Sequence, residues 1–98
     1  MERFQWSDGW LLAVLGSARV PMVRERLNSV GDAFNHAIFT DLEVIGGMHR
    51  LEIAGFARME GELFAATEAG RSFVETHWRN SAGHIDNMMR VIDALCKE

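Results

Sequence analysis

The chain has 98 residues, of which 48% are hydrophobic and 24% are charged, and it contains a single proline. This length and composition predict one folded, helix-rich domain over 1–98 and exclude a second domain or a disordered tail. The formal net charge of −4 gives the whole molecule no attraction to nucleic acid, so DNA binding requires a local basic patch.

No segment has the run of about eighteen apolar residues that a membrane span requires, and no basic segment after Met1 leads into an apolar run. We therefore expect a cytoplasmic protein without membrane contacts. Cys96 is the single cysteine, which excludes an internal disulfide and agrees with a reducing compartment. We expect its thiol to be buried, although near the chain end it could cross-link two chains.

The first two helices are predicted from their caps and their apolar spacing. The first covers 8–15, with Ser7 as its N-cap and Gly16 at its end. The second covers 21–35, where Pro21 suits the first turn. Its apolar residues recur at helical spacing, at Val23, Leu27, Val30 and Phe34.

A short apolar run at 37–39 (AIF) favours a small edge strand or an extended linker. Thr40 and Glu43 then form a capping box, which predicts the start of a third helix that Gly55 closes. At 100° per residue, one side of this helix faces the core and consists of Val44, Met48, Leu51 and Gly55.

Residues 56–67 predict two strands around Glu60-Gly61, a connection typical of a tight hairpin. Thr67 is the expected N-cap of a fourth helix over 68–80. A last helix is predicted over about 82–97, with an apolar seam at Ile85, Met88 or Met89, Ile92 and Leu95. The predicted fold class is therefore mainly α with a small β-hairpin.

This order of elements resembles the winged helix-turn-helix proteins, and local motifs support the resemblance over about residues 7–80. The third helix leaves through L-x-x-x-G-F (Leu51, Gly55, Phe56), and T-E-A-G-R (67–71) follows the hairpin. GDAFNHAIFT (31–40) is similar to the approach to the third helix in small bacterial PadR-like and MarR-like transcriptional regulators. The resemblance implies a winged-helix core with an added C-terminal helix, of the kind through which such proteins dimerise.

In winged-helix regulators the third helix enters the major groove and the hairpin touches the DNA backbone or minor groove. The resemblance therefore implies double-stranded DNA as a partner, contacted by Arg19, Arg24, Arg26, His49, Arg50 and Arg58. The local chemistry opposes this, because residues 40–64 carry a net charge of −3 and a phosphate backbone is repelled unless the acids point away.

The side of the third helix opposite the core is also apolar and carries Leu42, Ile45 and Ile53 near Gly46 and His49. Three interpretations are open. The N-terminal segment or last helix of the same chain covers this side, it forms an interface with a second copy or another protein, or it faces a DNA groove and meets thymine methyls. Gly46 and Gly47 favour the close approach of another backbone.

We expect a homodimer, because a short terminal helix gains most by pairing with its copy. The interface is predicted at Ile85, Met88, Met89, Ile92 and Leu95, and the alternative is that this helix folds back on its own domain. The leading hypothesis is thus a dimeric, non-enzymatic DNA-binding regulator. The alternative is a winged-helix module that binds protein and not DNA.

Nothing in the sequence predicts a catalytic residue, a metal site or a cofactor. The phosphate-binding and nucleophile motifs GxGxxG, GxxxxGK[ST] and GxSxG are absent. The histidines lie in separate predicted elements without metal-ligand spacing, at His36, His49, His77 and His84. Trp6, Trp10 and Trp78 are expected in the core, and the alternative is that they line a small-molecule pocket between the first helix and the later ones.

Overall fold

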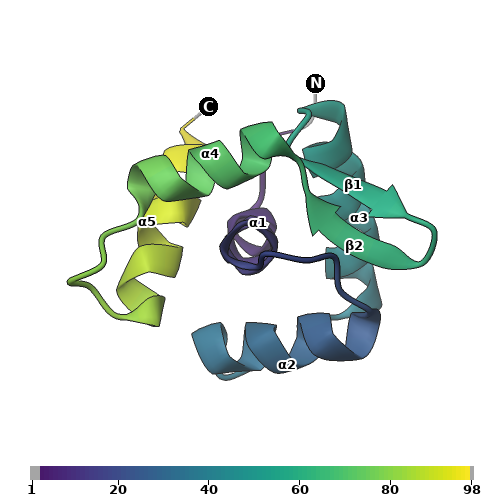
Figure 1. Ribbon diagram of the computed structural model, residues 1–98, viewed down its shortest axis with the longest axis horizontal. Coiled ribbons are helices and arrows are strands. Elements are labelled where there is room, and N and C mark those ends of the chain that lie inside the picture. The colour runs from purple at the N-terminus through teal and green to yellow at the C-terminus, as the bar shows by residue number, and fades with distance from the viewer. Residues whose placement is uncertain (1–2, 98) are drawn as a thin grey trace.

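The computed structural model describes residues 3–97, which fold into five helices and one two-stranded hairpin. In Figure 1, α1 (Trp6–Ser17) lies at the centre and is seen end-on. The surrounding elements are α2 (Arg24–Asn35), α3 (Asp41–Ile53), β1 (Ala57–Glu60), β2 (Leu63–Ala66), α4 (Glu68–His77) and α5 (His84–Cys96). The predicted fold class, mainly α with a small β-hairpin, is confirmed.

α1 is the central helix because apolar residues cover its whole circumference. Every residue from Ser7 to Gly16 is buried. A helix of this kind is stable only when other elements pack on all its sides. The predicted bounds 8–15 were too short. The N-cap is Gln5, and the helix continues through Gly16 to Ser17. Gly16 lies against Val74 of α4, where a Cβ would overlap that side chain.

A pairing that the sequence analysis missed joins the α1–α2 connection to the hairpin. The Met22 N–H donates to the Phe64 carbonyl at 2.9 Å, and the Phe64 N–H donates back to Met22 at 2.8 Å. Because the N–H and the carbonyl of Met22 both pair with Phe64, residues 21–23 are held outside the helix. As a result α2 begins at Arg24 and not at residue 21.

Residues 37–39 form an extended linker and no strand. Their anchor is Phe39, which is buried and stacks on Trp10 with ring centroids 3.7 Å apart. Trp10 also donates its indole N–H to the Gly31 carbonyl at 3.1 Å. These contacts fix the end of α2 and the start of α3 against α1.

The capping box at the start of α3 is confirmed. The Thr40 N–H donates to Glu43 Oε1 at 2.8 Å, and the Glu43 N–H donates to Thr40 Oγ1 at 3.1 Å. The predicted rotation of the helix is confirmed for Val44, Met48 and Leu51, which are buried. Gly55, predicted on the same side, is exposed and lies beyond the end of the helix. α3 ends at Ile53, and the chain turns into the hairpin at Gly55 with a positive φ of 83°.

The hairpin turn lies one residue later than predicted. Glu60 pairs with Leu63, so Gly61 and Glu62 form the turn, and Gly61 has a φ of 61°. Thr67 caps α4 as expected, since its Oγ1 accepts from the Gly70 N–H at 3.1 Å. α4 then ends at His77, three residues before the predicted end at 80.

α5 packs against α1 on the side opposite the hairpin (Figure 1). The two helices come close at Gly9, where a Cβ would lie 2.7 Å from the Ile92 Cα. The buried face of α5 consists of Met88, Val91, Ile92 and Leu95. Within the described residues, no helix combines the length and apolar character needed to cross a membrane.

Candidate functional site

The outer side of α3 carries exposed aliphatic residues on a helix whose other side lies in the core. We call Leu42, Ile45, His49 and Ile53 the α3 outer stripe. Leu42 is 83% exposed, Ile45 68% and Ile53 64%, and His49 is also exposed. The interpretation in which the same chain covers this side is therefore wrong for the described residues.

Arg50 does not belong to the exposed surface, although it was predicted as a DNA contact. Its Nε lies 2.6 Å from Asp8 Oδ2, and its Nη2 lies 2.9 Å from Asp8 Oδ1. The Asp8 side chain is 0% exposed and that of Arg50 is 10% exposed. Asp8 Oδ2 also accepts from the Gln5 N–H at 2.8 Å. A guanidinium held by a buried carboxylate in this two-bond geometry is not presented to a phosphate.

The two glycines of α3 make room for this ion pair and for α1. A Cβ at Gly46 would lie 3.1 Å from Arg50 Nη2, and a Cβ at Gly47 would lie 3.0 Å from Asp8 Oδ1. Leu11 is equally close to the second position, at 3.0 Å. The prediction that a backbone from outside approaches Gly47 was therefore wrong, since Gly47 is buried against α1. Gly46 is half-buried beside the Arg50 side chain.

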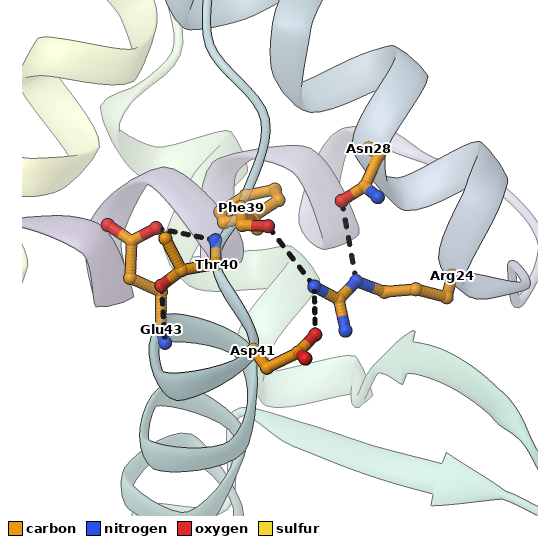
Figure 2. Close-up of polar contacts among 6 residues, drawn as sticks. All are labelled: Arg24, Asn28, Phe39, Thr40, Asp41 and Glu43. Carbon is orange, nitrogen blue, oxygen red and sulfur yellow. Dashed lines mark hydrogen bonds and ion pairs between the residues drawn. The ribbon is translucent and has the colours of Figure 1, made fainter.

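Arg24 is the second predicted DNA contact that has partners inside the fold. Figure 2 shows its guanidinium between α2 and the start of α3. Nε donates to Asn28 Oδ1 at 3.4 Å, and Nη2 donates to the Phe39 carbonyl at 3.1 Å. Nη2 also lies 3.0 Å from Asp41 Oδ1. The side chain thus links α2, the linker and the first turn of α3.

Replacing Arg24 by methionine is expected to lower the free energy of unfolding by about 1–2 kcal/mol. The change keeps the apolar part of the side chain and removes two interactions, the charged hydrogen bond to the Phe39 carbonyl and the ion pair with Asp41. The ion pair contributes little to the free energy of unfolding because it is partly solvated. The matched control is Arg26→Met on the exposed side of the same helix, expected within about 0.5 kcal/mol of the parent. Urea unfolding followed by circular dichroism measures both. Equal stability of the two variants would contradict the role assigned to Arg24.

The other predicted DNA contacts are dispersed over separate elements. Arg19 lies between α1 and α2, Arg26 lies on α2, and His49 lies on α3, and all three are exposed. Arg58 of β1 donates to Glu60 Oε2 at 3.3 Å, so its charge is offset on the same strand. The predicted cations thus come from the α1–α2 connection, α2, α3 and β1.

Most of the predicted dimer interface on α5 is used within the chain. Met88, Ile92 and Leu95 are buried against the core. Ile85 and Met89 remain partly exposed, at 48% and 37%. The alternative weighed in the sequence analysis, that this helix folds back on its own domain, is the one observed. α5 lies close against α1, because Gly9 leaves room for the Ile92 backbone.

A groove that the sequence analysis did not predict adjoins the outer stripe. It has a volume of about 850 Å³ and lies between the N-terminal segment, the end of α3 and the end of α5. His49 and Ile53 of the stripe line it together with Arg3, Phe4, Arg50, Ala54, Phe56, Leu95, Cys96 and Lys97. The stripe and this groove form one continuous surface, because they share two residues. No sequence signal identifies it, since its walls come from three distant segments.

Cys96 lies at the rim of this groove and is exposed, so the prediction of a buried thiol was wrong. Partial burial of the sulfur raises the pKa of the thiol, and the carboxylates of Asp8 and Asp93 raise this pKa further. The thiol is therefore mostly protonated at neutral pH. This environment is the opposite of the one that activates a cysteine nucleophile.

The three tryptophans have different surroundings. Trp10 is buried in the core as expected, whereas Trp6 is 43% exposed. Trp78 is half-buried and lines a second, more open groove of about 700 Å³ between the end of α1 and α4. The alternative of a pocket lined by all three is therefore wrong, because Trp6 and Trp10 are not part of that groove.

Comparison with known proteins finds no relative, because no family model, no curated protein and no solved structure matches the chain. Among residues 3–97, no three His, Cys, Asp or Glu side chains are grouped in a way that could hold a metal ion. The candidate functional site is therefore the α3 outer stripe together with the adjoining groove.

Proposed function

We propose that this chain is a non-enzymatic protein-binding module, in which a helix of another protein docks on the α3 outer stripe and the adjoining groove. The observation that carries the proposal is the exposure of Leu42, Ile45 and Ile53, at 64–83%, on one side of a single helix. Single exposed aliphatic residues are common on protein surfaces, whereas an aligned group of them marks an interaction site.

The spacing of the stripe suits a helical partner. Its residues lie at i, i+3, i+7 and i+11 of α3, the pattern through which one helix packs on another. Burial of each large aliphatic side chain contributes roughly 1.5–3 kcal/mol, while association costs roughly 4–15 kcal/mol. The stripe alone therefore supports only weak binding. The groove supplies the further apolar area, through Phe4 and Phe56.

A display library of helical peptides with leucines at i, i+3, i+4 and i+7 tests this proposal. We expect binders whose affinity falls about tenfold or more in the variant Leu42→Ser/Ile53→Ser. The matched control is Val20→Ser, which removes an equally exposed aliphatic residue (70%) outside the stripe, and binding should not change. The serine variants should fold normally, because the replaced side chains are exposed. A library without any binder sensitive to the double substitution would contradict the proposal.

A second candidate is the DNA-binding, transcriptional-regulator-like function that the winged-helix resemblance implies. It is favoured by the order of the elements and by an uncovered third helix beside a hairpin. Against it, the stripe presents no Arg, Asn or Gln for base reading, and Arg24, Arg50 and Arg58 have acidic partners.

Titration of a fluorescent random-sequence duplex separates the two functions. We expect no saturable rise in anisotropy at low salt, because Asp41, Glu43 and Glu52 on α3 repel phosphates. Binding at low salt that weakens steeply at moderate salt would support the DNA-binding candidate instead. Protein unfolding is excluded as a cause by measuring circular dichroism under both conditions.

A further inference from the structure

We infer that the helix that docks on α3 has two edges of opposite charge, a basic edge beside Glu52 and an acidic edge beside Arg3 and Lys97. The inference rests on the proposed function and specifies the partner of the same surface. It is carried by the different charges on the two sides of the α3 outer stripe.

One side of the stripe is acidic. At 100° per residue, Asp41 and Glu52 lie on the same side of α3 as Ile45, and all three are exposed. Asp41 is an ion-pair partner of Arg24, so its charge is partly offset. Glu52 is on the exposed surface, and no cation within residues 3–97 pairs with it. A partner helix lying along the stripe thus meets an uncompensated carboxylate on this side.

The other side of the stripe leads into the groove, and its cations lie at the groove end of α3. Glu43 lies on the same side at the opposite end of the helix, where its carboxylate accepts from the Thr40 N–H. Arg3 and Lys97 are exposed and line this groove together with His49 and Ile53. Neither cation pairs with a carboxylate within the described chain. Arg50 adds no net charge here, because Asp8 balances it. A partner side chain that reaches the groove rim is therefore favoured when it is acidic.

These opposite edges select against two other occupants. A two-fold antiparallel pair of α3 helices would place Glu52 against the acidic edge of its copy, and like charges across an interface are unfavourable. Duplex DNA presents negative charge on every side and would be repelled along the Glu52 edge. A parallel two-fold pair joins opposite edges, so the experiment below includes a measurement of self-association.

The test uses the full chain and a helical-peptide library with fixed leucines at i, i+3, i+4 and i+7 and only Lys or Glu at the edge positions. Among binders that require Leu42, we expect one edge to be enriched in Lys and the other in Glu. The Glu52→Lys variant should bind these peptides about fivefold more weakly and should select Glu on the edge that previously carried Lys. The control is Glu75→Lys, the same charge change on the exposed side of α4, which should leave the selection unchanged.

Three outcomes would overturn the inference. If Leu42-dependent binders carry Lys and Glu equally, or the same charge on both edges, the charge specificity is wrong and the docking function stands. If light scattering shows a dimer that Leu42→Ser/Ile53→Ser dissociates, the occupant is a second copy. If no binder depends on Leu42, the proposed function fails and the inference fails with it.

Discussion

Replacing Arg50 by methionine is expected to lower the free energy of unfolding by about 3–5 kcal/mol, a large share of the roughly 5–15 kcal/mol typical of a domain. The substitution leaves the Asp8 carboxylate buried, with 0% side-chain exposure and with the Gln5 N–H still donating to it. An unpaired buried charge costs more than the pair itself contributes. Urea unfolding, followed by tryptophan fluorescence and circular dichroism, measures the loss.

A double variant separates the charge effect from lost packing. In Asp8→Asn/Arg50→Met the buried charge is removed, while the amide oxygen of the introduced asparagine can still accept from the Gln5 N–H. We expect this variant to recover at least half of the stability lost in Arg50→Met. Arg90→Met, at an exposed site on α5, is the control and should change little. A loss below about 1 kcal/mol for Arg50→Met would show that solvent or another donor compensates Asp8.

Replacing Gly70 by alanine is expected to lower the free energy of unfolding by about 2–3 kcal/mol, although alanine by itself favours a helix by roughly 1 kcal/mol. A Cβ at this position would overlap the Phe56 carbonyl oxygen and lie 2.9 Å from its carbon. That carbonyl cannot move freely, because it accepts the Thr67 N–H at 3.0 Å and lies where α3 passes into the hairpin. Thermal unfolding should show a midpoint roughly 10–20 °C lower.

The matched control is Gly83→Ala, which makes the same change at a glycine with nothing within 4 Å of the added methyl. Its φ of −75° suits any residue, so only a small loss of cap preference is expected, within about 1 kcal/mol. If both variants unfold at the same midpoint temperature, the close approach of Gly70 to the Phe56 carbonyl does not limit the stability of the fold.

Features that depend on neighbours a few residues apart were readable from the sequence. The Thr40–Glu43 capping box and the Thr67 cap are local hydrogen bonds, and both are formed as predicted. The rotation of α3 followed from helical periodicity, which distinguishes its buried side from the side that carries Leu42 and Ile53. Periodicity located the exposed stripe, although it did not decide whether another segment covers it.

Features that join distant segments were decided by the tertiary structure. Asp8 and Arg50 are 42 positions apart, and neither residue alone predicts that the other neutralises it. α5 has an apolar seam that suits either a second copy or α1, and only packing against α1 settles its use. The groove draws its walls from residues 3–4, 49–56 and 95–97. Local sequence thus determined the Thr40 and Thr67 caps and the rotation of α3, because these depend on neighbours within a turn or two. The start of α2, the end of α4 and the pairing of charges and faces depend on which segments the fold brings together.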